Sequence, residues 1–190
     1  MEEKREHLLA NAEELFDTER YGEALAQYRN LAETGHPRAQ LMVGWIYHHG
    51  LGLQENLGEA RKWYSLAAGQ GSIEAQFNLG VLCMKQDDFA AGRDWYQKAA
   101  SQGYLPACYR LAWSYESGSS TTADREKAFS LFEQAMKEGH LLSQMEIAKR
   151  LLAGYRGPIR RLVGLGLMLK TYVQTVWIAV RDPLNDRIRW

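Results

Sequence analysis

Residues 60–71 read ARKWYSLAAGQG, and the pattern returns as GRDWYQKAASQG at 92–103 and as AFSLFEQAMKEG at 128–139. A weaker copy, ALAQYRNLAETG, occupies residues 24–35. The glycines that close these four segments are 36, 32 and 36 residues apart. A period in the thirties with two apolar blocks per unit is typical of stacked helical hairpins. The repeat therefore predicts an all-α chain built from such hairpins.

The spacing of the apolar residues indicates that both halves of each repeat are helices. In the first segment they lie at i, i+3, i+4, i+7 and i+8 on one helix face; they are Ala60, Trp63, Tyr64, Ala67 and Ala68. A second apolar block follows each closing glycine, and its four copies occupy residues 36–50, 72–84, 104–118 and 140–154. Gly44 and Gly80 share one position of this second block. A glycine that recurs inside a helix indicates the close approach of a neighbouring helix.

The two blocks together form the pattern AxxxLGxxYxxG…KAxxWYxKAAxxG, present here as AQLMVGWIYHHGLG followed by EARKWYSLAAGQG. This pattern resembles the Sel-one-like repeat family, which is closely related to the tetratricopeptide repeats. The resemblance implies a right-handed α-α superhelix, or solenoid, of about five antiparallel helix pairs. It also implies that the first helix of each pair lines a concave face.

We expect ten helices, near residues 2–17 and 21–34, 37–49 and 56–70, 72–86 and 88–102, 105–117 and 123–138, and 140–153 and 159–180. We divide the chain into a tetratricopeptide-like helix pair at 1–35, Sel-one-like repeats at 36–154 (36–71, 72–103, 104–139 and a partial 140–154), and an apolar, basic-flanked C-terminal helix and tail at 155–190.

Composition excludes several classes of protein. With 46% hydrophobic and 24% charged residues, the 190-residue chain is typical of a globular protein. Its 23 basic residues balance 23 acidic ones, which argues against nucleic-acid binding. The N-terminus starts acidic and has no apolar run of the kind that marks a secretory signal, so we expect a cytoplasmic protein. Two cysteines, Cys83 and Cys108, are too few for a disulfide framework.

The sequence offers no catalytic or metal-binding constellation. It contains no GK[ST] phosphate loop, HExxH, CxxC or GxSxG motif. His48 and His49 are adjacent, so on a helix their side chains point about 100° apart, and no third metal ligand lies nearby in sequence. We therefore expect no enzyme activity, no cofactor and no metal.

In the first helix expected at 37–49, Ala39, Val43 and Tyr47 form the packing stripe. A second face of the first helices, about 100° from this stripe, is a candidate binding surface. It is rich in aromatic and polar residues: Arg38, Met42, Trp45, His49, Asn78, Val81, Arg110 and Trp113. Tryptophan and arginine dominate the energetics of protein interfaces. The alternative is that these tryptophans pack against neighbouring first helices within the array.

The C-terminal helix is the second candidate contact region. Residues 162–180 carry one formal charge, Lys170, and arginines flank both ends. The candidate contact residues are Arg160, Arg161, Leu165, Leu169, Val173 and Trp177. A charge at the centre costs about 2.5–3.5 kcal/mol on insertion, so membrane spanning is marginal. Three outcomes stay open: a cap on the solenoid, a helix lying on an anionic membrane surface, or a contact with a second copy or a partner helix.

These patterns favour a non-catalytic interaction module, an adaptor or scaffold that binds a protein or peptide segment on its concave face. The alternative is a membrane-associated scaffold or regulator that residues 159–180 anchor to the inner face of a membrane. No nucleic-acid partner is expected, and the pattern also allows a homodimer through the C-terminal helix.

Overall fold

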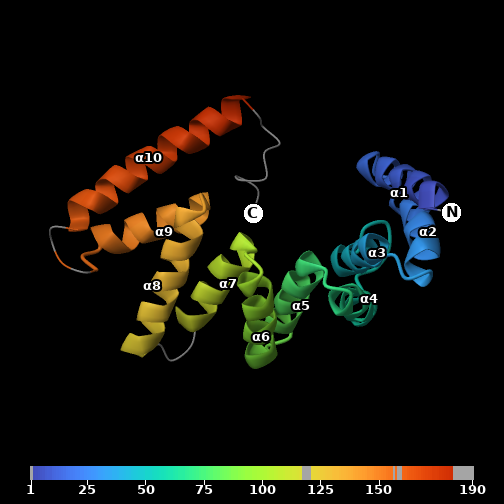
Figure 1. The fold of residues 1–190 in the computed structure, drawn as a ribbon, viewed down its shortest axis with the longest axis horizontal. Helices are drawn as coiled ribbons and strands as arrows, with labels where there is room; N and C mark the ends of the chain where they lie inside the picture. Colours follow the sequence, from blue (N-terminus) through green and yellow to red (C-terminus); the bar gives the residue numbers. More distant parts are fainter. Residues whose placement is uncertain (1, 117–120, 156, 158–159, 182–190) are drawn as a thin grey trace. The chain divides into compact units, whose positions relative to one another are not determined.

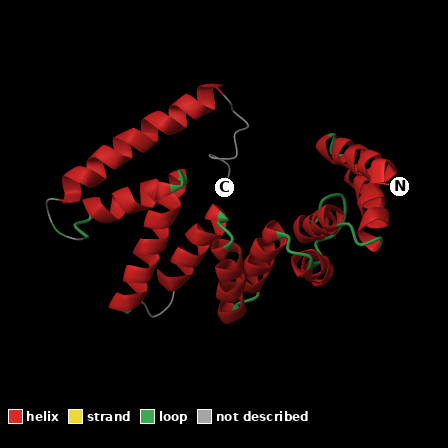
Figure 2. Ribbon diagram, in the orientation of Figure 1, coloured by secondary structure: helices red, strands yellow, loops and turns green. Residues whose placement is uncertain are grey.

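The computed structural model describes residues 2–116, 121–155, 157 and 160–181, and over these residues all regular structure is helical (Figures 1 and 2). The helices are α1 (Glu2–Asp17), α2 (Tyr21–Glu33), α3 (Pro37–His49), α4 (Leu57–Gly69), α5 (Ile73–Lys85), α6 (Phe89–Ser101), α7 (Leu105–Glu116), α8 (Thr122–Lys137), α9 (Leu141–Leu152) and α10 (Arg160–Arg181). Each lies within one residue of its predicted bounds, so the predicted all-α array of helix pairs is confirmed.

The chain divides into two compact units, Met1–Gln102 and Gly103–Trp190. The N-terminal unit contains the three helix pairs α1–α2, α3–α4 and α5–α6, and the C-terminal unit contains α7–α8 and α9–α10. Within each unit the second helix of a pair also contacts the first helix of the next pair. This succession is the solenoid arrangement that the repeat predicts.

Glycines in the left-handed region end the second helices. Gly71 follows α4 with φ +90° and Gly139 follows α8 with φ +89°. The residue after each glycine donates its backbone N–H to a carbonyl in the last helical turn, from Ser72 to Ala67 and from His140 to Ala135. The same Ser72 and His140 then accept a backbone N–H through their side chains and begin the next helix. One short turn thus closes one pair and opens the next.

Aromatic rings lie over the recurrent glycines in the N-terminal unit. A Cβ atom on Gly44 would lie 2.6 Å from Tyr64 Cδ1, and one on Gly80 would lie 2.5 Å from Tyr96 Cδ1. Both tyrosines are buried, at 0% and 3% exposed. The predicted close approach at these two glycines is therefore confirmed, and it brings the two helices of one pair together.

Glutamines at one register position of α3, α5 and α9 connect these helices to the second helices of their pairs. Gln70 Nε2, at the end of α4, donates to Gln40 Oε1 of α3 over 2.7 Å, and Gln102 donates to Gln76 in the same way over 2.7 Å. In the C-terminal unit the equivalent Gln144 accepts from the Thr171 hydroxyl of α10, over 3.2 Å. Helix α10 thus takes the place of a second helix, paired with α9 (Figure 1).

The face of α10 that packs on α9 is its small and polar one. Gly164 and Thr171 are buried there, and a Cβ atom on Gly164 would lie 2.9 Å from the Ala148 carbonyl oxygen. The opposite, apolar face is exposed, with Leu162 at 75% and Leu169 at 61%. Among the described residues no helix combines the length and the apolar character needed to cross a bilayer.

Candidate functional site

The candidate binding surface on α3 lies beside, and apart from, the core face of that helix. Ala39, Val43 and Ile46 are fully buried. Arg38, Trp45 and His49, the residues predicted to form the second face, are exposed, and Met42 is partly buried. We call Arg38, Met42, Trp45 and His49 the α3 strip.

Local contacts hold the aromatic part of the α3 strip in place. The rings of Trp45 and His49 stack with centroids 3.9 Å apart, and His49 Nδ1 lies 3.0 Å from the Trp45 carbonyl oxygen. Trp45 nevertheless stays 36% exposed. A ring that is already ordered and still accessible loses little entropy when a partner covers it.

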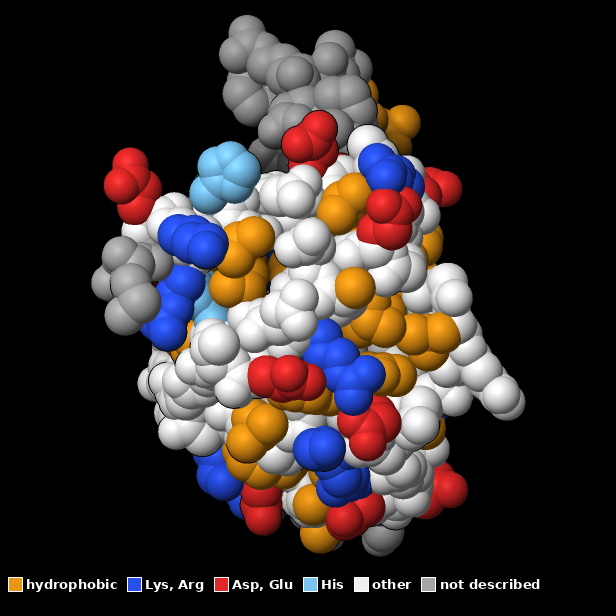
Figure 3. Space-filling model, turned by 90° about the vertical axis from the view of Figure 1, so that its right-hand side faces the viewer, with side chains coloured by type: hydrophobic (Ala, Val, Ile, Leu, Met, Phe, Trp, Pro, Cys, Tyr) orange, Lys and Arg blue, Asp and Glu red, His pale blue; other side chains and the backbone are white. Residues whose placement is uncertain are grey.

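Charged pairs surround the strip. Arg38 Nε lies 3.5 Å from Glu13 Oε1 of α1. Lys85, at the end of α5, forms an ion pair and hydrogen bond with Glu55, and this hydrogen bond lowers the pKa of the Glu55 carboxyl. Figure 3 views the molecule from the side on which α1 and α2 lie in Figure 1, and there small apolar groups alternate with charges of both signs. The α3 strip and the two charged pairs together can offer an apolar anchor and charged groups of both signs.

The two predicted residues on α5 differ in accessibility. Val81, at the register position of Trp45, is partly buried. Asn78 is only 6% exposed, so its side chain belongs to the interior of the N-terminal unit and does not contribute to an exposed strip.

The C-terminal unit presents its own candidate residues on α7. Arg110 is exposed and Trp113 is 40% exposed. The Trp113 ring meets Tyr109 and Phe132 edge to face, with centroids 6.4 Å and 6.3 Å apart. Part of Trp113 therefore packs within the unit, on α7 and α8, while part remains accessible. The candidate residues thus fall into two groups, one in each unit.

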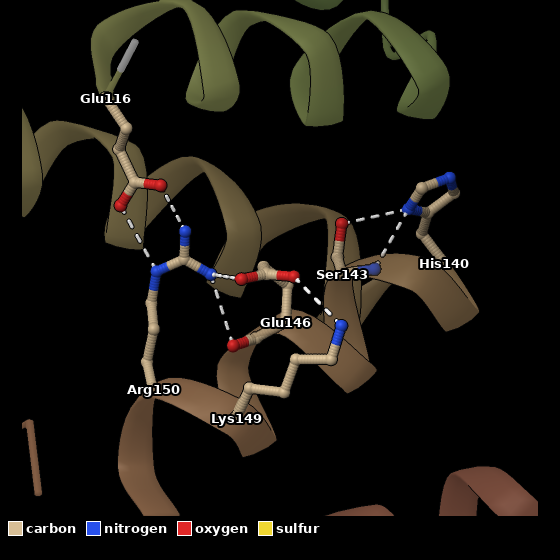
Figure 4. A network of polar contacts seen from close by, with 6 residues as sticks. All are labelled: Glu116, His140, Ser143, Glu146, Lys149 and Arg150. Carbon is tan, nitrogen blue, oxygen red and sulfur yellow. Dashed lines mark hydrogen bonds and ion pairs between the residues drawn. The ribbon is translucent and has the colours of Figure 1, made fainter. Parts of the chain in front are cut away.

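An arginine network that the sequence reasoning missed adjoins Trp113, because the Arg150 guanidinium lies 5.6 Å from the centroid of the Trp113 ring. Arg150 of α9 forms ion pairs with Glu116 of α7 and Glu146 of α9 (Figure 4). Its guanidinium also lies 4.4 Å from the centroid of the Phe132 ring. The side chains of Arg150, Glu116 and Glu146 are only 15%, 20% and 12% exposed. A signal was present in the sequence, because Arg150 stands at the register position of the apolar Ile46 and Leu82.

A shallow pocket of about 390 Å³ lies beside this network. Its lining combines two cations, one anion and one aromatic ring with the end of α9; it consists of Glu116, Arg125, Arg150, Ala153, Gly154 and Tyr155. Among the described residues, no group of three or more His, Cys, Asp or Glu side chains could hold a metal ion.

The candidate contact residues of α10 are exposed wherever the structure describes their side chains. Arg160 and Arg161 are exposed at the start of the helix, and Leu165, Leu169 and Val173 are 50%, 61% and 64% exposed. The side chain of Trp177 lies outside the described residues.

Buried His48 gives the N-terminal unit a pH-dependent stability. His48 is 7% exposed, and its Nδ1 lies 3.4 Å from the Tyr64 hydroxyl. Burial, with smaller contributions from His49 and Lys85, lowers the pKa of His48 to about 4. The unfolded chain binds this proton near pH 6.5 and the folded chain does not, so stability falls as the pH drops from about 6.5 to about 4.

We expect His48→Gln to remove a large part of this dependence, on the order of 2 kcal/mol. Urea unfolding at pH 7 and at pH 4.5 measures it. The exposed neighbour provides the control, and His49→Gln should keep most of the wild-type slope, because burial is the larger cause of the lowered His48 pKa. Burial also lowers the pKa of His140 in the C-terminal unit, which leaves a residual dependence of the same sign. Equal pH slopes in wild type and His48→Gln would contradict the assignment.

Helical hairpins closed by left-handed glycines, with exposed aromatic residues on their first helices, define a helical-repeat protein of the kind that binds other proteins. The Sel1 repeat model matches residues 37–72, 73–104 and 105–140, which is more than half of the chain. The chain therefore belongs to the Sel1 repeat family. Repeats of this kind are generally protein-interaction modules, and their fold is typically a non-catalytic scaffold.

Two curated proteins are similar to this chain. A sel1-like repeat-containing protein of Acanthamoeba polyphaga mimivirus is 29% identical over 127 residues, covering 67% of this chain and 18% of that protein. The chitin synthase regulator SKT5 of Saccharomyces cerevisiae is 39% identical over 61 residues, covering 32% and 9%. The chain thus spans less than a fifth of the length of these relatives.

A solved structure confirms the fold. The crystal structure of a Sel1 repeat protein from Oxalobacter formigenes has a TM-score of 0.73 at 24% identity, covering 87% of this chain and 70% of that one.

Proposed function

We propose that this chain is a non-catalytic adaptor that binds a segment of a partner protein on the exposed aromatic residues of its first helices. The observation that carries the proposal is Trp45, which is 36% exposed although it is stacked on His49. Trp113 stands at the same register position and is 40% exposed. Trp63, by contrast, is buried at 6% and serves the core.

The α3 strip supplies what such a site needs. Tryptophan anchors commonly account for 2 kcal/mol or more of binding energy each. Arg38 and the Lys85–Glu55 pair add charged groups beside the anchor, and such rim charges favour correct orientation more than affinity. In the C-terminal unit, Arg110 and Trp113 supply the equivalent pair.

The yeast relative supports a role exerted on another protein, since its name describes it as a regulator of chitin synthase. For this chain we propose only that it acts by binding another protein, without catalysis.

The test is a selection of random peptides on phage against the full chain, followed by affinity measurement of the selected peptides on variants. We expect each selected peptide to bind one of the two variants, Trp45→Ala or Trp113→Ala, at least about 30-fold more weakly, because its tryptophan anchor is then missing. The control is Phe89→Ala, because Phe89 is 52% exposed and lies outside the strip. Helix content by circular dichroism should stay unchanged in all three variants.

Two results would overturn the proposal. Selected peptides that bind the two tryptophan variants as tightly as the wild type must occupy another surface. A tryptophan variant that loses its fold would show that the ring is part of the core, as the packing alternative holds.

A further inference from the structure

The exposed face of α10 follows the spacing of a coiled-coil seam. Its large apolar residues alternate at three and four positions along the helix; they are Leu162, Leu165, Leu169, Tyr172 and Val176. We call these five residues the α10 seam. They are 75%, 50%, 61%, 70% and 45% exposed. Alternation at three and four residues is the pattern by which two helices pack along their length.

Helix α10 cannot turn this seam inward. Its opposite face is fixed on α9, where Gly164 contacts the Ala148 backbone and Thr171 hydrogen-bonds Gln144. Helix α8 contacts both α7 and α9, whereas α10 packs chiefly on α9 among the described residues. Among the described residues the seam therefore stays exposed, and another chain can cover it.

The apolar surface is large enough for a stable contact. Met168 and Val173 extend the seam, and with it they make seven exposed large apolar residues. At on the order of 170 Å² for a fully exposed large side chain, their exposed fractions amount to roughly 700 Å². A standard interface buries about 800 Å² on each partner.

The charges of α10 favour a copy of the same helix. Charges beside a coiled-coil seam choose the partner by attraction or repulsion. Here the flanking positions within the helix hold Gly166, Met168, Val173 and Thr175, and only Arg161 at the helix start is charged. Lys170 lies off the seam. A neutral seam of this kind does not repel its own copy, and pairing through a two-fold axis uses one surface on both partners.

We propose that the α10 seam joins two copies of this chain into a dimer. An antiparallel pairing centred between Lys170 and Thr171 sets Leu165 opposite Val176 and Leu169 opposite Tyr172 of the second copy. It also aligns the helix dipoles favourably. This contact is separate from the peptide-binding role proposed above, because it uses none of the residues of the α3 strip.

The experiment is sedimentation equilibrium of the full chain from about 1 to 100 µM. We expect the wild type to be a dimer and Leu169→Glu to weaken dimerisation at least about 100-fold, because each dimer then carries two carboxylates in the seam. The matched control is Leu66→Glu on α4, since Leu66 is also an exposed leucine, at 46%. It should remain a dimer, as should Trp45→Ala.

Thermal unfolding checks that Leu169→Glu is folded. We expect that it is, because Leu169 is 61% exposed and its replacement should not unfold the chain. A wild type that is monomeric at 100 µM would overturn the proposal, as would a folded Leu169→Glu that dimerises like the wild type. The proposal would also be overturned if the wild-type chain sediments with phosphatidylserine vesicles as a monomer and Leu169→Glu does not. That result would assign the seam to a membrane surface.

Discussion

Gly80→Val is expected to lower the free energy of unfolding of the N-terminal unit by about 3 kcal/mol. The first added carbon would lie 2.5 Å from Cδ1 and 2.6 Å from Cε1 of Tyr96. The tyrosine ring cannot move aside easily, because it is 3% exposed and packs against Phe77 with centroids 5.6 Å apart. The two helices of the pair must therefore separate, and the contacts between them are lost.

Urea unfolding followed by circular dichroism measures this loss. The same effect is expected for Gly44→Val, where the new carbon meets Tyr64 at 2.6 Å. The control is Gly22→Ala in α2, which meets nothing within 4 Å. It should stabilise the chain by about 0.4–1 kcal/mol, since alanine restricts the unfolded chain. If Gly80→Val and Gly22→Ala unfold at the same urea concentration, the close helix approach is not what holds the pair together.

Arg150→Met is expected to destabilise the C-terminal unit by about 3 kcal/mol. The change leaves Glu116 and Glu146 largely buried without their shared cation. Lys149, whose Nζ lies 3.7 Å from Glu146, compensates only in part, because its side chain is 58% exposed and solvent screens its charge. Adding Glu146→Gln to Arg150→Met should recover part of the loss, because one of the two unpaired charges is then gone.

Hydrogen exchange locates the effect in the unit concerned. The amides of α9 should lose protection in Arg150→Met, while those of α3 keep theirs. The matched control is Arg29→Met, since Arg29 pairs with Glu33 on the surface, where the two side chains are 53% and 59% exposed. It should cost no more than about 0.5 kcal/mol. Equal losses in the two variants would mean that burial of the Arg150 network contributes nothing.

The helix bounds could be predicted because the repeat fixes them several times over. Gly71 ends one helix, Ser72 begins the next, and a left-handed glycine recurs at the same place after α2, α6 and α8. The accessibility of Trp45 and the burial of Trp63 also follow from register, since one lies off the packing stripe and the other on it.

Other features depend on contacts that no local pattern encodes. The small and polar face of α10 packs on α9 because Gly164 permits a close backbone approach and Thr171 hydrogen-bonds Gln144. Hydropathy alone would favour the opposite orientation. The ion pair of Arg150 with Glu116 joins residues 34 positions apart, so helical spacing could indicate only its partner Glu146. The repeat pattern also did not predict that the chain divides into two units after Gln102.

The glutamine contacts bear on how such an array grows and shrinks over evolutionary time. Each closes inside one hairpin, from Gln70 to Gln40 and from Gln102 to Gln76. Gln40 additionally donates to the Ala32 carbonyl of the preceding hairpin, over 3.1 Å. Excising residues 36–71 would bring Gln76 to the place of Gln40, with its own partner already attached. A gene of this kind can therefore gain or lose a whole hairpin without leaving a buried glutamine amide unpaired.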